Sequence, residues 1–405
     1  MSHLAGASAL AGSALALGRS LRANAAQLKR SRKSCILLWM GGGPPTIDIW
    51  DMKPGATTGG EFKPIATTGE VQINELMPKL AKQMHQLTVV RSMSTREADH
   101  TRGTYYLHTG FVPNPNVVHP SYGSVVAKEV PVPGLEIPPF VSIGGASEGP
   151  GFLGMAYAPF QVDSNGRVRD LERTPDAARM NDRMQLLGLL ERRFIRENRG
   201  SAAEEHAKVL ESTRQLMTTE QMSAFRVDQE SPTTREKYGA TGFGRGCLMA
   251  RRLVEAGVPF VEVTMGGWDL HQNCFDTLQT KLPELDQAMS ALVEDLVDRG
   301  LYDDTIVLWM GEFGRTPRIN ANAGRDHWAR SWSVVAGGGR LARGGVIGAT
   351  NDDGTRVETA PYSSEDLMAT VCQAMGISLA TTYTASNGRP MKIAGGGKTI
   401  EGLIA

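Results

Sequence analysis

The sequence is poor in cysteine and carries no net charge. Its 405 residues include only four cysteines, Cys35, Cys247, Cys274 and Cys372, and none of them sits in a CxxC pair. So few scattered thiols exclude a disulfide framework, and we expect at least Cys35 and Cys372 to be small core residues. The 43 Lys and Arg residues balance 43 Asp and Glu residues. A neutral chain has no overall field to attract nucleic acid, so we expect no nucleic-acid partner.

The N-terminal apolar stretch is too short to span a membrane. Residues 4–17 are small or apolar over 14 positions, whereas a membrane-spanning helix needs about 20. This length, and the pattern Ala23-Asn24-Ala25 that follows, are typical of a signal peptide with its cleavage site. We therefore expect segment 1–28 to be signal-peptide-like. The protein would be exported, periplasmic or extracellular, with no stable membrane span.

The same segment lacks the positively charged residues with which signal peptides begin. Only MSH precedes the apolar stretch. We therefore hypothesise that the natural protein begins upstream of Met1. The upstream residues could include a twin-arginine pair, which would direct export by the Tat pathway. The alternative is a short amphipathic helix packed on the domain.

Strand and helix signals alternate along the rest of the chain. With 41% hydrophobic residues the chain can bury a large core. Apolar runs predict strands, and amphipathic periods that end at glycine predict helices. The strands are expected at 35–41, 87–93, 259–265, 305–310 and 331–339, and the helices at 242–257, 282–300 and 363–377. This alternation predicts an α/β fold with a mostly parallel central sheet and helices on both faces.

Two further features complete the expected layout. Ser364 is the expected N-cap of the last helix, and Gly376 its expected end. Between about 167 and 225 the sequence is charged, poor in glycine and helically periodic, without a strand signal. We expect this region to be a helical excursion from a single domain that spans 33–405.

Carboxylates, imidazoles and other polar groups follow the expected strands. Ligands of open α/β sheets bind at the carboxyl ends of the strands, so side chains just past each strand are candidates for a site. The candidates, in chain order, are Asp48 and Asp51, His100 and Thr101, Asp269 and His271, Glu312 and Arg315, and Asp326 and His327. Three of the eight histidines are among them. Four strand ends are therefore expected to converge on one rim.

This mixture of side chains suits a divalent metal ion. Carboxylates and imidazoles bind zinc, or manganese and iron where the geometry is octahedral. Asp269 and His271, close together in a turn, could both reach one ion. Of the neighbouring residues Asp326 and His327, one could bind the ion and the other could hydrogen-bond to a ligand of the ion. Arg315 could clamp an anion with two hydrogen bonds, and an ion beside a phosphate or sulfate would neutralise charge and orient a nucleophile.

Each of these residues also has a plainer interpretation. Glu312 and Arg315 could pair with each other on a surface loop. His271 could be a surface histidine held by a hydrogen bond, and His100 could cap a helix. Only their common position past strand ends favours a metal site over these alternatives.

The motifs as a set resemble a known family. The resemblance is carried by LLWMGGGPPTIDIWDMKPG, ADHTRGTYYLHTG, VPFVEVTMGGWDLHQN, GEFGRTPRINANAGRDHW and SSEDLMATVCQAMGI. Together these motifs resemble the DUF1501 family. Its members are secreted bacterial proteins that are abundant in planctomycetes and related to the alkaline phosphatase and sulfatase superfamily. The match runs from about Ser34 to the C-terminus. The resemblance implies an alkaline-phosphatase-like α/β fold with a metal-dependent hydrolase site.

The resemblance also implies metal ligands. Asp48 is the best match to the metal-binding aspartate that follows the first strand of the superfamily, with Asp51 close behind. Asp269 and His271 match an aspartate and a histidine after a later strand, although their spacing here is tighter. We therefore expect these four residues among the ligands.

The last motifs depart from the superfamily pattern. Glu312 stands in the place of a metal-binding aspartate, and His327, with Asp326 beside it, supplies the histidine that follows. The resemblance thus implies that Glu312, Asp326 and His327 are also metal ligands. His100 falls at the position of the nucleophile and Thr101 comes directly after it, whereas sulfatases carry a modified cysteine or a serine there. Formylglycine-type sulfatase chemistry is therefore not expected, and both Thr101 and His100 remain candidates for the reacting group.

The leading hypothesis is a secreted metal-dependent hydrolase of phosphate or sulfate esters. Its cofactor would be one or two divalent ions, with zinc, manganese, iron and calcium as candidates, and its partner a small-molecule or glycan ester substrate. The alternative is a non-catalytic cell-surface module that binds carbohydrate or serves as a scaffold and keeps the metal site. A third interpretation is a degenerate homologue without metal. The sequence does not indicate an oligomeric state.

Overall fold

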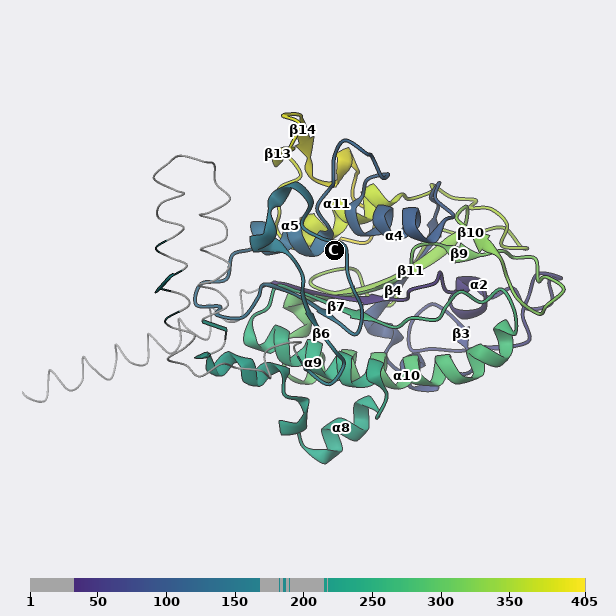
Figure 1. The fold of residues 1–405 in the computed structure, drawn as a ribbon. Coiled ribbons are helices and arrows are strands. Elements are labelled where there is room, and N and C mark those ends of the chain that lie inside the picture. Colours follow the sequence, from purple (N-terminus) through teal and green to yellow (C-terminus); the bar gives the residue numbers. More distant parts are fainter. Residues whose placement is uncertain are drawn as a thin grey trace, which may run out of the picture.

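An eight-stranded sheet is the central feature of the computed structural model (Figure 1). The structure describes residues 33–167 and 218–404, together with the single positions 182, 185, 186, 189, 215 and 216. The expected signal-peptide-like segment 1–28 lies outside the described residues, as does most of the expected helical excursion at 167–225. Within the described part of the chain, every helix is too short or too polar to cross a membrane.

The sheet is mostly parallel, as the sequence predicts. In spatial order its strands are β12 (Val346–Ile347), β4 (Leu87–Met93), β11 (Trp332–Gly338), β8 (Thr305–Met310), β1 (Ser34–Trp39), β7 (Phe260–Thr264), β5 (Phe140–Ile143) and β6 (Phe160–Val162). Neighbours are parallel except around β11, which runs antiparallel to both β8 and β4. Because β11 reverses the direction twice, β4 runs the same way as β8. The carboxyl ends of β4, β8, β1, β7 and β5 therefore share one edge.

Helices cover both faces of the sheet (Figure 1). One face carries α9 (Gly242–Ala256) and α10 (Cys274–Asp298), and the other carries α4 (His100–Thr109), α5 (Tyr122–Glu129) and α11 (Ser364–Ala374). The shorter α-helices and strands are α2 (Thr46–Ile49), α3 (Pro78–Ala81), α8 (Pro232–Tyr238), β2 (Pro64–Ile65), β3 (Ile73–Asn74), β9 (Gly314–Arg315), β10 (His327–Trp328), β13 (Thr382–Thr384) and β14 (Pro390–Lys392). Short 3-10 helices are η1 (Met84–Gln86), η2 (Gly151–Leu153), η3 (Met155–Tyr157), η4 (Glu220–Phe225), η5 (Val227–Gln229), η6 (Tyr302–Asp304) and η7 (Ile393–Gly396).

The apolar run of β1 is explained by burial on both faces. All residues of the strand are buried. Ile36 and Leu38 pack in the core beneath α9 and α10. Cys35 and Leu37 point to the opposite face, because side chains alternate along a strand, and pack in the core beneath α5 and α11. A strand that is covered on both sides needs apolar residues at every position.

The N-cap of α11 is Ser363, one residue before the expected Ser364. The Ser363 hydroxyl accepts a hydrogen bond from the Asp366 backbone N–H at 3.2 Å, and the Asp366 carboxylate accepts one from the Ser363 N–H at 2.9 Å. This reciprocal pair is a capping box, which fixes the start of the helix at both residues. Ser364 is instead the first helical residue, and its hydroxyl donates to the Tyr106 carbonyl at 2.7 Å.

Helix α10 begins at Cys274, earlier than the expected 282–300, and continues through Pro283. Proline removes one backbone hydrogen bond and is more often found near a helix start. Here the turns before it bury Cys274, Phe275 and Leu278. This apolar face extends that of the predicted helix, and we attribute the longer helix to its burial.

Candidate metal centre

Three imidazoles and a carboxylate meet at the carboxyl edge of the sheet. This group, the His-Asp cluster, consists of His100, Asp269, His271 and His327. His100 begins α4 after β4, and Asp269 and His271 follow β7. His327 returns by the β9–β10 hairpin, in which it pairs with Arg315. Residues that lie far apart in the sequence are brought together because their strands end at one edge.

Two glycines allow these segments to approach. Gly42, in the turn after β1, has a φ of +117°, and a Cβ there would lie 2.5 Å from the backbone nitrogen of Asp269. A Cβ on Gly103 of α4 would lie 3.1 Å from the Phe313 ring and 3.3 Å from Cβ of Glu312. The close contacts of α4 and of the β1 turn with the site therefore require residues without a side chain.

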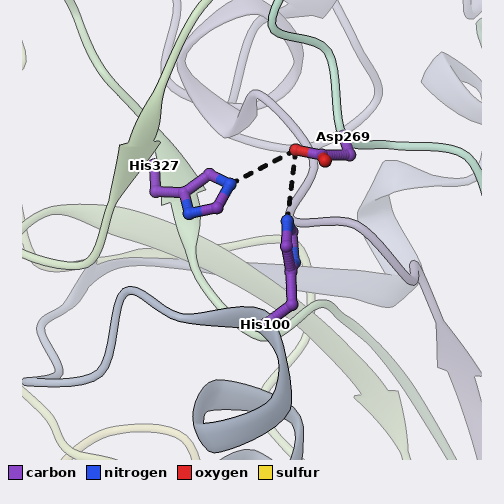
Figure 2. Close-up of side chains that lie close together, drawn as sticks. All are labelled: His100, Asp269 and His327. Carbon is purple, nitrogen blue, oxygen red and sulfur yellow. Dashed lines mark hydrogen bonds and ion pairs between the residues drawn. The ribbon is translucent and has the colours of Figure 1, made fainter.

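One oxygen atom, Oδ1 of Asp269, lies at the centre of the cluster. Figure 2 shows the imidazoles of His100 and His327 directed at it, with Nε2 at 3.1 Å and 3.3 Å. Nε2 of His271 lies 3.0 Å from the same oxygen and 3.0 Å from Nε2 of His327. The ligand atoms of His100, Asp269 and His327 all lie within 4.8 Å of one another.

The other ring nitrogen of each histidine is held by an acceptor. His327 Nδ1 donates to the Ala98 carbonyl at 2.7 Å, and this contact fixes the tautomer because a carbonyl oxygen only accepts. His271 Nδ1 lies 2.8 Å from Asp326 Oδ1, and His100 Nδ1 lies 2.6 Å from Glu312 Oε1. With Nδ1 as the donor, the neutral imidazoles direct the Nε2 lone pairs into the cluster. Metal-binding histidines are oriented in this way.

These positions fit a bound cation. Two ligand atoms on one ion lie about 3.0 Å apart at a right angle and about 3.4 Å apart at a tetrahedral angle, because metal–nitrogen distances are about 2.1 Å. The observed separations around Asp269 Oδ1 are 3.0, 3.1 and 3.3 Å. Without a cation or an added proton, the lone pairs of His271 and His327 would face each other and a carboxylate. The chemistry of the donors therefore favours a divalent ion.

Arg315 holds the central carboxylate in place. Its Nη2 donates to Asp269 Oδ1 at 2.5 Å. Burial raises the pKa of Asp269, but the hydrogen bond and charge of Arg315 lead the effects that hold this pKa well below its ordinary value. The remaining contacts of Arg315 are with the backbone carbonyls of Gly43, Gly42 and Arg325. The buried guanidinium thus holds Asp269 in position. To clamp an anion, as the sequence suggests, Arg315 would have to give up some of these contacts.

Glu312 lies behind His100 and is almost fully buried. Its Oε1 accepts hydrogen bonds from His100 Nδ1 at 2.6 Å and from the Gly42 N–H at 2.9 Å. The hydrogen bond that His100 donates to Glu312 is the main cause that raises the pKa of His100. The second oxygen, Oε2, is buried and has no hydrogen-bond partner among the described residues. In this geometry Glu312 orients His100, and Oε2 remains available for a cation.

The structure does not bring Asp48 and Asp51 to the cluster, in contrast to the ligand role expected for them. Both oxygens of the buried Asp48 accept from Arg325, at 2.7 and 2.8 Å. Asp51 is also buried and lies 3.1 Å from Lys53 Nζ and 3.4 Å from Arg91 Nε. Both carboxylates are thus paired with cationic side chains and not with the histidines of the cluster.

The other predicted residues lie at or near the cluster. Thr101 follows His100 in the first turn of α4 and is exposed. His100, at the expected nucleophile position, is itself a member of the cluster, and a nucleophilic role for either residue remains a prediction. Asp326 is exposed and lies behind His271, whose hydrogen bond lowers the pKa of this carboxyl group.

Two groups that support the cluster were not found by sequence reasoning. The Ala98 carbonyl orients His327, and a backbone carbonyl carries no signal in the residue type. Asn320 donates to the His271 carbonyl at 3.0 Å and lies 3.3 Å from Asp326 Oδ1. Asn320 belongs to the loop between Arg315 and His327. The asparagines of this loop were the sequence signal that could have indicated its supporting role.

Several solved structures align with much of the chain at low identity. The lipoteichoic acid synthase LtaP from Listeria monocytogenes is 8% identical, with 86% of this chain and 73% of that chain covered and a TM-score of 0.38. The PsFucS1 sulfatase from Pseudoalteromonas sp. is 13% identical, with 88% and 70% covered and a TM-score of 0.42. Alkaline phosphatase from the Antarctic bacterium TAB5 is 12% identical, with 80% and 96% covered and a TM-score of 0.31. No curated protein matches the chain. Because the identities and TM-scores are this low, we draw no conclusion about activity from them.

The sequence also matches a family profile over nearly its whole length. The profile described as "Protein of unknown function (DUF1501)" covers residues 32–404. This range contains the central sheet and every member of the His-Asp cluster. The motifs that resemble this family are thereby confirmed as a family signature. The chain belongs to the DUF1501 family.

Proposed function

We propose that this protein is a divalent-metal-dependent hydrolase of phosphate or sulfate esters. The observation that carries the proposal is the convergence of three imidazole Nε2 atoms on Asp269 Oδ1, with each Nδ1 held by an acceptor. The choice of ester is supported by the strand-end motifs that resemble the alkaline phosphatase and sulfatase superfamily.

The ligand set narrows the choice of metal. His100, His271 and His327 offer nitrogen and Asp269 offers one oxygen. Calcium takes six to eight oxygen ligands, whereas imidazole suits zinc and iron, and mixed nitrogen and oxygen sites also accept manganese. We therefore propose zinc, manganese or iron rather than calcium.

Each residue near the cluster would have a distinct part in the reaction. When bound, the ion would neutralise the anionic ester and act as a Lewis acid. The three histidines and Asp269 would hold it, and Arg315 keeps Asp269 ionised and in place. Asp326, Glu312 and the Ala98 carbonyl keep the imidazoles in the tautomer that binds a cation.

The first test is the metal content of the full chain, purified without chelators and measured by elemental mass spectrometry. We expect about one or two equivalents of zinc, manganese or iron, and a loss of metal in His327→Gln. His85→Gln is the matched control, because His85 is bonded to Thr68 at the surface and lies outside the cluster. An absence of metal in the wild type, even after supplementation, would refute the proposal.

The second test is turnover. The metal-loaded protein is assayed with aryl phosphates, phosphodiesters and aryl sulfates, and we expect hydrolysis of at least one class. The second candidate is a non-catalytic metal-binding module. The contacts of His100 favour it, because His100 stands at the expected nucleophile position and both of its ring nitrogens already lie against Glu312 and Asp269. Metal binding without hydrolysis of any ester would support this candidate.

We also propose that the protein is exported, on the basis of the signal-peptide-like segment 1–28. N-terminal sequencing of the native protein tests this directly. Cleavage near Ala25 is the expected result, and a mature protein that retains Met1 would contradict it.

A further inference from the structure

A half-buried lysine lies beside the loop that carries Asp269. Lys281, two turns into α10, donates a hydrogen bond from Nζ to the Gly266 carbonyl at 2.7 Å. The ammonium also lies 5.1 Å from the centre of the Trp268 ring, which holds it by a cation–π contact. Among the residues that the structure describes, Lys281 forms no ion pair, although the charge of Glu284, three residues further along α10, acts on it. Of its three N–H donors, two thus remain for a ligand.

The loop next to this ammonium is open to solvent. Gly266, Gly267 and Asp269 are exposed, whereas Trp268 between them is fully buried and anchors the loop. A Cβ on Gly266 would meet no atom of the described residues within 4 Å, and a Cβ on Gly267 would lie 3.2 Å from Lys281 Nζ. The exposed side of the glycine pair therefore has free space, and the ammonium borders it.

This space adjoins the His-Asp cluster. Gly267 is two residues from Asp269 in the sequence, so their Cα atoms are at most about 7 Å apart. The Lys281 ammonium therefore borders the same short loop that carries the central carboxylate of the cluster, and a ligand that reaches both would need about the length of a substituted aromatic ring.

Charge supports an anionic ligand at Lys281. The guanidinium of Arg315, which contacts the cluster, is buried and donates hydrogen bonds to Asp269 and to backbone carbonyls. Lys281 has one hydrogen bond, to the Gly266 carbonyl, and the carboxylate of Glu284 acts on it by its charge without an ion pair among the described residues. Burial lowers the pKa of Lys281, so its ammonium lacks part of the solvation that a bound anion would replace.

We propose that Lys281 binds a second negative charge on the substrate. The preferred ester would then carry a further anionic group, such as a carboxylate or a second phosphate or sulfate, beside the group held at the cluster. This inference rests on the proposed function, which places the first anionic group at the cluster. Lys281 would be a residue that determines specificity.

The experiment compares phosphonates that cannot be hydrolysed. Phenylphosphonate and the 2-, 3- and 4-carboxyphenylphosphonates are titrated by calorimetry into the full-length protein loaded with Mn²⁺. We expect at least one carboxyphenyl isomer to bind roughly tenfold more tightly than phenylphosphonate, which is the scale of one hydrogen bond between charged groups. In Lys281→Met this preference should disappear, while the Kd values of phenylphosphonate and Mn²⁺ stay unchanged.

Two further variants control for packing and for general charge. Lys281→Arg keeps the cation and should keep part of the preference. Lys237→Met removes an ammonium that lies 3.2 Å from Glu294, in the second half of α10, and should leave every Kd unchanged.

The outcomes separate this inference from the proposed function. A wild type that binds Mn²⁺ and phenylphosphonate but shows no isomer preference, or a preference that survives Lys281→Met, overturns the inference alone. A wild type that binds Mn²⁺ but none of the phosphonates also overturns the inference alone. A wild type that does not bind Mn²⁺ overturns the proposed function, and this inference with it.

Discussion

Glu312 Oε1 lies 2.6 Å from Nδ1 of His100, although the two residues are 212 positions apart in the sequence. The same oxygen accepts the Gly42 N–H, so one buried carboxylate joins the segments that follow β8, β4 and β1. The orientation of His100 therefore depends on a residue that the sequence analysis placed among the metal ligands.

The first prediction is that Glu312→Gln weakens metal binding about 10- to 100-fold, the usual effect of losing a group that orients a ligand. The amide keeps one acceptor but loses the charge, and its NH₂ group would replace the buried Oε2, which has no partner among the described residues. Competition with a chelating dye measures the affinity. Glu75→Gln is the control, because Glu75 accepts from Lys63 at an exposed site. Equal affinity in wild type and Glu312→Gln would show that His100 does not need this carboxylate.

The second prediction separates the observed role of Asp48 from the expected one. Asp48 forms a buried two-point ion pair with Arg325. Asp48→Asn should lower the free energy of unfolding by about 3–5 kcal/mol, because it leaves a buried guanidinium without its counter-charge. Metal stoichiometry should not change. Urea unfolding and elemental analysis of the same sample check both parts.

A double variant sharpens this test. Asp48→Leu combined with Arg325→Met removes both charges, so it should be less destabilising than either single change. Loss of metal from folded Asp48→Asn would restore Asp48 to the ligand set.

The third prediction concerns pH and the buried pair of His108 and Glu262. Nε2 of His108 lies 3.3 Å from Glu262 Oε1, and Nδ1 donates to the Thr104 carbonyl at 2.9 Å. Burial disfavours the charged imidazole, but the charge and hydrogen bond of Glu262 outweigh this and raise the pKa of His108. A histidine whose pKa is raised in the folded protein stabilises the fold at pH values below its pKa in the unfolded chain, which is about 6.5. This stabilisation is lost as the pH rises through the pKa of the folded protein.

His108→Gln should therefore cost about 1–3 kcal/mol of unfolding free energy near pH 6 and less near pH 9. Urea unfolding at both pH values measures the difference, with His85→Gln as the surface control. A cost that is the same at both pH values would mean that His108 does not change its charge in the folded protein over this range.

The fourth prediction uses two glycines that both have a positive φ but have different surroundings. Gly42 has a φ of +117°, and a Cβ there would lie 2.5 Å from the Asp269 nitrogen. Gly55 has a φ of +83°, and within the described part of the chain a Cβ there would meet no atom within 4 Å. Gly55→Ala should cost about 1–2 kcal/mol of unfolding free energy from backbone strain alone. Gly42→Ala should cost more and should also lose metal, because the Asp269 backbone must move.

Thermal unfolding and metal analysis of both variants distinguish strain from displacement. If Gly42→Ala retains full metal content, the close approach of the β1 turn to Asp269 is not needed by the site.

The sequence by itself determined the layers of the fold and the edge that carries the site. The apolar run of β1 predicts a strand buried on both faces, and Ile36 and Cys35 do point to opposite cores. Strand-end residues of a mostly parallel sheet must share one edge, which is why Asp269 and His271 could be placed beside His100 without a structure.

Only the tertiary structure decided which partner each of these side chains takes. A carboxylate is equally suited to a metal ion, an arginine or an imidazole, and the residue type alone does not select among them. Asp48 faces Arg325, Glu312 faces His100, and Asp269 faces three imidazoles, because packing of distant segments sets these distances. The N-cap of α11 follows the same rule at short range, since Ser363 and Ser364 differ only in which one reaches Asp366. Periodicity fixes where a residue lies on its element, and the contacts between elements fix what it binds.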